Sequence, residues 1–458
     1  MTDNTFGAEK PNIIRRALES VWLIPVLFAY AFFCWHYRLS ILSVAGFSLF
    51  FVLILIFCKN IRNIYAPVLY IGFFIRDITG VNWTGYLICI AAVCTALLIF
   101  TIKTAVEKRG EFKRGKMFFA LLVADAAFLL GGSLGRFDIM QTGIVFGFCA
   151  AVMILYLLAV NCTENFTDYL ALLFIVGALF VSAEIMVTKI NDGDLFSTNP
   201  MGETFFFSAH SLNTAAIFIM LGIAGCYYRG AGRKRDALYL LLSLFFTFVV
   251  FLSCCRTVLA VSLVLVAAVA IIMYIKSPRK KVYLGVVAAL AAAAVIAAFF
   301  FTDHILKFID MIIAKIRRGL NGRDELWPWC VRRFLEYPAL GYGFIASETV
   351  PTVRVNLVLA HNTLLQWLTS TGIIGTSLMV YFYIRKYKAV FSGVRSVAKT
   401  FIILAVICVE LTGMMDQAAS MDIFVFSLPV LLLAGADTPV REMQAAPMPR
   451  AELSFGAV

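Results

Sequence analysis

Residues 255–275 read CRTVLAVSLVLVAAVAIIMYI, an apolar run that carries a single charge, Arg256. A helix that crosses the hydrocarbon core of a bilayer needs about 20 such residues. The whole chain shares this character, since 62% of its 458 residues are hydrophobic and 14% are charged. Soluble domains usually have about a quarter charged residues. The composition therefore excludes an ordinary cytosolic enzyme, a disordered chain and a fibrous repeat, and it predicts an integral membrane protein.

Apolar segments of similar length recur along the chain, and their number predicts about 12–14 transmembrane helices. They lie near residues 17–37, 41–58, 61–80, 84–104, 116–134, 142–160, 168–190, 206–228, 236–253, 255–275, 281–301, 363–384, 398–414 and 421–436. The first run continues past Ala29-Tyr30-Ala31, which resembles a signal-cleavage site, so we expect an uncleaved anchor.

Basic residues cluster after the even-numbered segments. The clusters lie at 59–62, 103–116, 229–235, 276–281 and 385–388, and Lys10, Arg15 and Arg16 precede the first segment. Short basic loops stay on the cytoplasmic side, so the pattern predicts an even number of spans with both termini inside.

The predicted fold class is an all-α integral membrane protein with one large extracytoplasmic loop that contains short helices. Four regions are expected. They are the N-terminal part of the transmembrane bundle at 1–301, the large outer (periplasmic) loop at 302–361, the C-terminal transmembrane helices at 362–436 and a cytoplasmic tail at 437–458.

Two helices are expected within the outer loop. Residues 304–318 show an apolar face at helical spacing, which predicts a helix lying on the membrane surface. Residues 325–336 predict a second helix, with Asp324 as its N-cap. Gly341-Tyr342-Gly343 then predicts a turn.

Several kinds of chemistry find no support in the sequence. The eleven cysteines include no CxxC pair, and no two of the four histidines have metal-ligand spacing. No glycine-rich phosphate loop is present either. We therefore expect no metal, no cofactor, no ATP-driven motor and no nucleic-acid partner.

Three acids lie within predicted spans, Asp125, Glu184 and Glu410, where they mark an ion path or bond to neighbouring helices.

His361 lies where the outer loop enters a predicted span. Imidazole titrates near neutral pH and can take a proton from a hydroxyl group, so His361 is a candidate general base. Asn362 follows it, and nine residues, 363–371, separate Asn362 from Gly372-Ile373-Ile374-Gly375. The residues alone equally allow an interfacial or helix-capping histidine followed by a packing patch of small residues.

Several arginines are candidate anion-binding groups. Arg256 begins an apolar span. A charge in this position is costly and usually has a function, although an arginine at the end of a span can instead snorkel to the surface. Arg323 can bind phosphate through two hydrogen bonds, or pair with a loop acid such as Asp324. Arg332 and Arg333 are further candidates, although a basic surface facing lipid head groups explains them equally well.

The order of these motifs resembles the O-antigen ligase and polymerase superfamily of membrane glycosyltransferases. Three features of residues 250–380 match. The first is Cys255-Arg256-Thr257 before a long apolar run. The second is Gly322-Arg323 followed by Trp327, Pro338 and Gly341-Tyr342-Gly343. The third is His361-Asn362, separated by nine residues from Gly372-Ile373-Ile374-Gly375. One departure is Cys255, since serine more often precedes this arginine in the family.

The resemblance implies a donor glycan on undecaprenyl diphosphate and an acceptor hydroxyl on a glycan or lipid core. It implies that Arg256 and Arg323 bind the diphosphate and that His361 is catalytic, in an inverting, metal-independent transfer. The residues expected to support the catalytic and diphosphate-binding groups are Asn362, Arg332, Arg333, Gly372 and Gly375. The reaction would take place at the outer face of the cytoplasmic (inner) membrane, in lipopolysaccharide or exopolysaccharide biosynthesis of the cell envelope.

Three other functions stay open from the sequence. A polymerase would join lipid-linked repeat units with the same three residues, although the nine-residue spacing favours a ligase. A flippase for the lipid-linked glycan would have many spans too, but charged groups near the midplane would be expected. A structural or assembly protein of the envelope would leave the ordered motifs unexplained.

Overall fold

The structure is a computed structural model of the chain. It describes residues 13–37, 39–69, 83–108, 110–134, 139–191, 212–253, 255–300, 323–350, 353–357, 360–393, 396–413 and 423–437, together with six single positions between 302 and 313.

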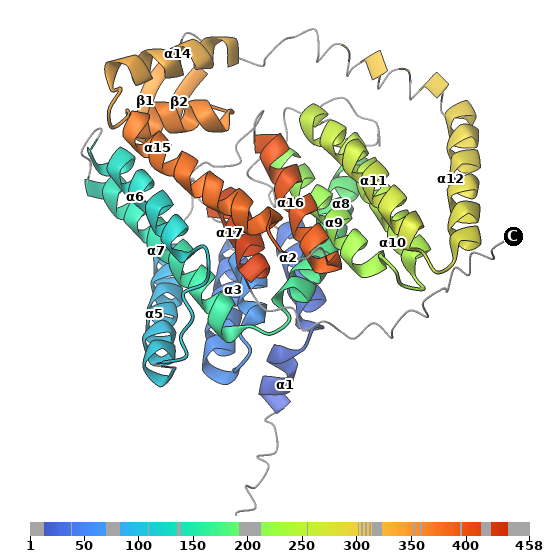
Figure 1. The fold of residues 1–458 in the computed structure, drawn as a ribbon, viewed down its shortest axis with the longest axis horizontal. Helices are drawn as coiled ribbons and strands as arrows, with labels where there is room; N and C mark the ends of the chain where they lie inside the picture. Colours follow the sequence, from blue (N-terminus) through green and yellow to red (C-terminus); the bar gives the residue numbers. More distant parts are fainter. Residues whose placement is uncertain are drawn as a thin grey trace, which may run out of the picture.

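Helices dominate these residues, and they form a bundle with a small layer across one end (Figure 1). The bundle helices are α1 (Ile13–Glu19), α2 (Leu23–His36), α3 (Ser40–Phe57), α5 (Trp83–Glu107), α6 (Phe118–Leu134), α7 (Ile139–Cys162), α8 (Phe166–Asn191), α9 (Leu212–Gly230), α10 (Asp236–Leu252), α11 (Arg256–Lys276), α12 (Lys280–Phe300), α15 (Thr363–Phe391), α16 (Val397–Gly413) and α17 (Ile423–Asp437). Their bounds follow the predicted apolar segments closely, because a chain in lipid must bond its own backbone groups and the helix does so within one segment.

Two predicted segments differ from a single straight helix. The first divides into α1 and α2, which meet at a bend of 77°. The third, predicted at 61–80, begins with a short 3-10 helix, η1 (Arg62–Ile64), and stays helical to Leu69. The rest of that segment lies outside the described residues.

Four of the described helices are long and apolar enough to cross a membrane: α7 from Val145 onward, α8, α11 and α15. The bent pair α1–α2 makes a fifth if it forms one span, and α3, α6, α9 and α10 contain shorter apolar helices. The prediction of an all-α membrane protein is confirmed. The total of 12–14 spans stays a prediction.

Small residues let the central helices of the bundle approach closely. A Cβ added at Gly222 of α9 would lie 2.4 Å from the Cβ of Ala178 on α8, and one at Gly225 would lie 2.6 Å from the carbonyl oxygen of Ala171. Such contacts replace the hydrophobic driving force that helices lack inside lipid. They let α8 and α9 pack closely against each other.

The three acids of the predicted spans have different surroundings. Glu410 of α16 pairs with the buried Lys386 of α15, at 2.5 Å between its Oε1 and the Nζ of Lys386. Asp125 and Glu184 are buried, and Oδ1 of Asp125 and both carboxyl oxygens of Glu184 accept no hydrogen bond from the described residues.

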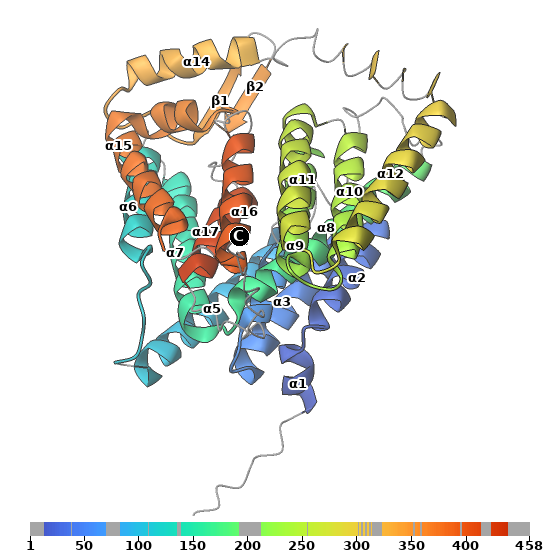
Figure 2. The ribbon, with the colours of Figure 1, turned by 45° about the vertical axis from the view of Figure 1, so that its right-hand side comes forward.

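The loops that carry basic clusters gather at one end of the bundle. The following contacts join them: Lys59 N–H to Glu19, Ile61 N–H to the carbonyl oxygen of Cys162, Lys108 Nζ to the carbonyl oxygen of Asn161, and Lys116 N–H to Asp437. The loops between α9 and α10 and between α11 and α12 lie at the same end in both views (Figures 1 and 2).

The outer layer lies at the opposite end, and we define it as residues 323–350 and 353–357. It consists of α14 (Arg323–Glu336) and an antiparallel hairpin of β1 (Ile345–Val350) and β2 (Val353–Leu357). Figure 2 shows this layer above α15, at the end of the bundle away from α1. The helix predicted at 325–336 is confirmed, although it begins two residues earlier, so Asp324 lies in its first turn rather than capping it. The hairpin was not predicted, and the surface helix predicted at 304–318 falls largely outside the described residues.

Candidate functional site

Helix α15 breaks at Gly372, where φ is 63° and ψ is −167°. In an unbroken helix the N–H groups of Ile373 and Ile374 would bond the carbonyl oxygens of Thr369 and Ser370. Instead they donate to Pro338 and Ala339, at 2.8 and 3.2 Å. The break therefore leaves two donors and two acceptors that need partners from elsewhere in the chain.

The turn at Gly341-Tyr342-Gly343 supplies the missing donors. The N–H of Tyr342 bonds the carbonyl oxygen of Thr369 at 2.7 Å, and the N–H of Gly343 bonds that of Ser370 at 3.1 Å. Gly341 and Gly343 both have positive φ, which confirms the predicted turn. A Cβ at Gly341 would lie 2.4 Å from the backbone of Ser370, so no larger residue fits this approach. Residues 338–343 thus attach the outer layer to the broken helix through four main-chain hydrogen bonds.

His361 lies at the start of α15 with φ of 49°, in the left-handed region. Non-glycine residues rarely adopt this conformation, and such positions gather at functional sites. Asn362 is the N-cap of α15, and its side chain accepts a hydrogen bond from the N–H of Leu365 at 3.0 Å. The structure therefore gives Asn362 a capping role and fixes the chain on the C-terminal side of His361.

Ala360, the residue before His361, is held on both of its backbone groups. Its carbonyl oxygen accepts from Nε1 of Trp327 at 2.8 Å, and its N–H donates to Oε1 of Gln366 at 2.8 Å. Gln366 in turn donates through Nε2 to the hydroxyl of Ser370, again at 2.8 Å. Sequence reasoning missed Gln366, because a glutamine within an apolar helix has no motif of its own.

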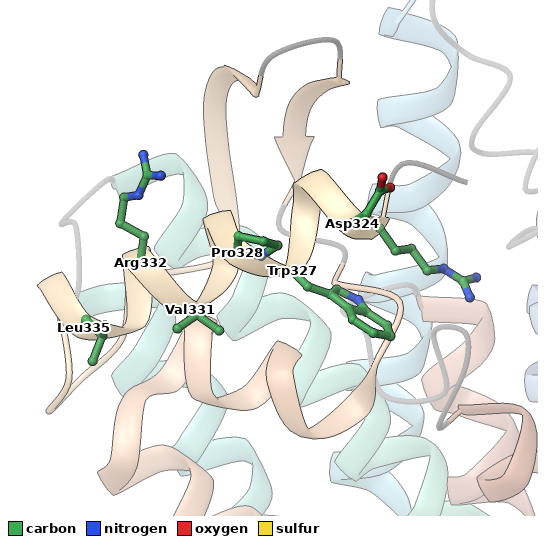
Figure 3. Close-up of a pocket in the computed structure, with 7 residues that line it drawn as sticks. Asp324, Trp327, Pro328, Val331, Arg332 and Leu335 are labelled. Atoms are coloured by element: carbon green, nitrogen blue, oxygen red, sulfur yellow. The ribbon is translucent and has the colours of Figure 1, made fainter. Parts of the chain in front are cut away.

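A groove of about 630 Å³ runs along α14 (Figure 3). Its lining residues are Arg323, Asp324, Trp327, Pro328, Val331, Arg332 and Leu335. Arg323, Trp327, Val331 and Leu335 follow one another at four-residue steps, so they share one face of the helix. Trp327 belongs both to the groove and to the hydrogen bond on Ala360, so it connects the groove to the residue before His361.

Arg256 is the first residue of α11, as predicted for a charge at the end of a span. Helix α11 packs on α16, and the last residue of α16, Gly413, accepts a hydrogen bond from the hydroxyl of Thr363 at 2.8 Å. The starts of α11, α14 and α15 lie at the same end of the bundle, with α16 packed between α11 and the start of α15 (Figure 1). Arg256 and Arg323 are the first residues of α11 and α14, and His361 lies two residues before the start of α15.

Arg333 has a different environment from its neighbour Arg332. It forms ion pairs with Glu336 and with Glu348 of β1, the latter at 2.5 Å, and its guanidinium lies over the rings of Trp329 and Tyr342. Arg332 is exposed and lines the groove. These contacts favour a structural role for Arg333, whereas Arg332 is available to a ligand in the groove.

Glu348 joins α14 to the hairpin. It accepts hydrogen bonds from the hydroxyl of Tyr342, from Nε1 of Trp329 at 3.0 Å and from Arg333. Burial raises the pKa of its carboxyl, but these three donors and the positive charge of Arg333 outweigh burial and lower the pKa to about 2. The sequence offered no signal for this cluster, because its members lie up to 19 residues apart.

Gly375 lies one turn beyond the break. A Cβ there would come within 2.3 Å of the side chain of Thr371. The paired glycines of the motif thus mark the break in α15 and the packing just after it. Among the described residues, no group of three His, Cys, Asp or Glu side chains could hold a metal ion.

These features define a multi-pass, all-α membrane protein with an outer layer fixed to a broken helix. Residues 239–380 match the family model described as O-antigen ligase. This match confirms the resemblance to the O-antigen ligase and polymerase superfamily over the part of the chain that runs from α10 into α15. It contains Arg256, Arg323 and His361, and the members of this family are membrane glycosyltransferase-like enzymes of ligase or polymerase type. No curated protein matches the chain.

Proposed function

We propose that this protein transfers a glycan from undecaprenyl diphosphate to an acceptor hydroxyl, as an O-antigen ligase. The observation that carries the proposal is the placement of His361. Its backbone is held in the left-handed region, and Trp327 connects the preceding residue to a groove that begins at Arg323. A candidate base and a candidate anion-binding group thus lie on adjoining elements of the domain that matches the family.

In the proposed reaction the acceptor oxygen attacks the anomeric carbon of the donor sugar. The bond from that carbon to the diphosphate oxygen breaks, and its electron pair stays on the leaving diphosphate. Arg323 and Arg256 stabilise the developing negative charge, as fixed positive groups do in phosphate-leaving reactions. His361 takes the acceptor's proton. A single displacement of this kind inverts the anomeric configuration.

The distribution of charge supports an extracytoplasmic site. The basic loops gather at the end of the bundle opposite the outer layer, and short basic loops favour the cytoplasmic side. In this orientation the groove and His361 face the outer side of the inner membrane, where a lipid-linked glycan presents its sugar and diphosphate.

Replacing His361 with asparagine tests the proposal. Asparagine tolerates the left-handed conformation better than most residues, so His361→Asn removes the imidazole without adding backbone strain. We expect glycan transfer from a purified lipid-linked donor to fall by about 10²–10⁴-fold, with an unchanged melting temperature. His361→Ala should lose the same activity. Near-normal transfer by either variant at matched protein levels would defeat the assignment of the base.

The products of the same assay separate ligase from polymerase. With lipid-linked repeat units as the only glycan, a polymerase makes a ladder of longer glycans, whereas a ligase requires a separate acceptor. A covalent product formed in detergent, with no membrane to cross, would exclude a protein that only transports the donor.

A further inference from the structure

The backbone immediately before His361 is held by two side chains from different elements. Trp327 of α14 donates to the carbonyl oxygen of Ala360, and Gln366 of α15 accepts from its N–H. Ala360 is fully buried and Gln366 is 3% exposed, so water does not substitute for these partners. Both backbone groups of Ala360 thus depend on these two side chains.

His361 itself sits in a conformation that its own backbone does not favour. A left-handed φ on a residue other than glycine persists only when the surrounding structure holds it. The chain is fixed after His361 by the Asn362 cap and before it by the two bonds to Ala360. The backbone conformation of His361, from which its imidazole projects, is therefore set by its neighbours rather than by intrinsic preference.

Gln366 extends this restraint to the break in α15. Its Nε2 donates to the hydroxyl of Ser370, whose carbonyl oxygen is one of the two that the break leaves to the outer layer. Ser370 is fully buried as well. One side chain therefore connects the start of α15, where His361 lies, to the turn at 341–343.

We propose that Gln366 is a positioning residue for the transfer reaction, acting with Trp327 to hold Ala360 and so to place the His361 imidazole against the acceptor hydroxyl. The inference rests on the proposed role of His361 as the base. Gln366 touches no reacting atom and acts through His361 alone.

Two substitutions of Gln366 separate the hydrogen bonds from the shape of the side chain. Gln366→Met keeps the length of an unbranched side chain but neither accepts from Ala360 nor donates to Ser370. Gln366→Glu keeps both bonds in its neutral form, which burial favours: its carbonyl oxygen accepts from Ala360 and its hydroxyl donates to Ser370. Ser377→Ala is the matched control, because it removes a polar group from an exposed position of the same helix.

We expect Gln366→Met to lower kcat about 100-fold, as small misplacements of catalytic groups do, while KM stays within about twofold. Gln366→Glu should recover most of the lost kcat, and Ser377→Ala should behave as the unmodified protein. Trp327→Phe, which keeps a ring but loses the donor, should also lower kcat. In the double variant H361N/Q366M, transfer should equal that of H361N alone, because groups that act as a unit are not additive.

The outcomes separate this inference from the proposed function. Near-normal transfer by H361N would overturn the role of His361 and the inference with it. An inactive H361N beside a Gln366→Met variant of normal kcat would overturn the inference alone. A double variant that loses activity beyond H361N would also overturn it, since Gln366 would then act by another route. If Gln366→Met shows no cooperative melting transition, Trp327→Phe takes its place in the same cycle with H361N.

Discussion

The backbone N–H of Tyr342 bonds the carbonyl oxygen of Thr369 at 2.7 Å and thereby supplies the partner that α15 loses at Gly372. Buried carbonyl groups in a membrane protein must find donors within the chain. The turn at 341–343 supplies these donors to the carbonyl groups of α15 just before Gly372. The outer layer and the broken helix therefore form one structural unit.

Gly372→Ala should disrupt this unit. Its φ and ψ lie in a region that only glycine adopts readily, and an added Cβ would lie 2.5 Å from the backbone of Ala339. We expect a loss of about 2–3 kcal/mol or more in stability, seen as a lower melting temperature in detergent. Gly285→Ala on α12 is the control, because a Cβ there meets nothing within 4 Å. Equal melting temperatures for the two variants would contradict the strain at the break.

Glu348→Gln should change how the outer layer responds to acid. The carboxyl has an ordinary pKa of 4.5 and a pKa of about 2 in the folded protein. A lowered folded pKa contributes stability that is fully present above pH 4.5 and is lost as the pH falls toward 2. The unmodified protein should therefore lose protease resistance in the outer layer over this range.

The glutamine variant should be less resistant at pH 7 and should show little further change on acidification. Proteolysis at pH 7, 4 and 3, with acid-tolerant protease and mass analysis of the cleavage sites, measures both. Parallel acid responses of the two proteins would show that Glu348 does not hold the layer.

The buried Lys386 pairs with the half-buried Glu410, and the loss of one partner should cost more than the loss of both. The ammonium of Lys386 also lies 3.3 Å from the ring centre of Tyr383. Lys386→Met leaves the carboxylate of Glu410 without its partner, at a cost of about 3–5 kcal/mol. The double variant K386M/E410L should recover most of that loss, because replacing both charges by apolar groups is often neutral. Thermal melting of the single and double variants tests this, and additive losses would exclude the coupling.

The positions of the bundle helices were predictable from the sequence. Apolar length alone sets where a helix can cross lipid, so α10 and α11 begin and end within a few residues of the predicted segments. The helix at 325–336 was likewise predictable, because the acidic residue Asp324 at its start is a local signal. The predicted sites at the ends of these elements, Arg256, Arg323 and His361, accordingly lie at one end of the bundle.

The contacts that hold the site could not be predicted in this way. Trp327 and Ala360 are 33 residues apart, and their hydrogen bond depends on the docking of α14 above α15. The hairpin of β1 and β2 was not predicted, since the outer loop was interpreted as two helices and a turn at 341–343. The glycines of the motif were identified by their spacing, but the left-handed break at Gly372 depends on residues 338–343, which no local pattern connects to it.

Arg332 and Arg333 are adjacent in the sequence, but their substitution should affect different properties, donor binding for Arg332 and stability for Arg333. Arg332 is exposed and lines the groove. Arg332→Ala should therefore raise the KM for the lipid-linked donor several-fold, about 1 kcal/mol for an exposed charge, and leave the melting temperature unchanged. Arg333→Ala removes the partner of Glu348 and the contacts to two rings. It should lower the melting temperature and reduce kcat only as far as the outer layer loosens. Steady-state kinetics and thermal melting on both variants provide the comparison. A raised KM for Arg333→Ala with normal stability would instead place the ligand on the Glu348 side of α14, away from the groove.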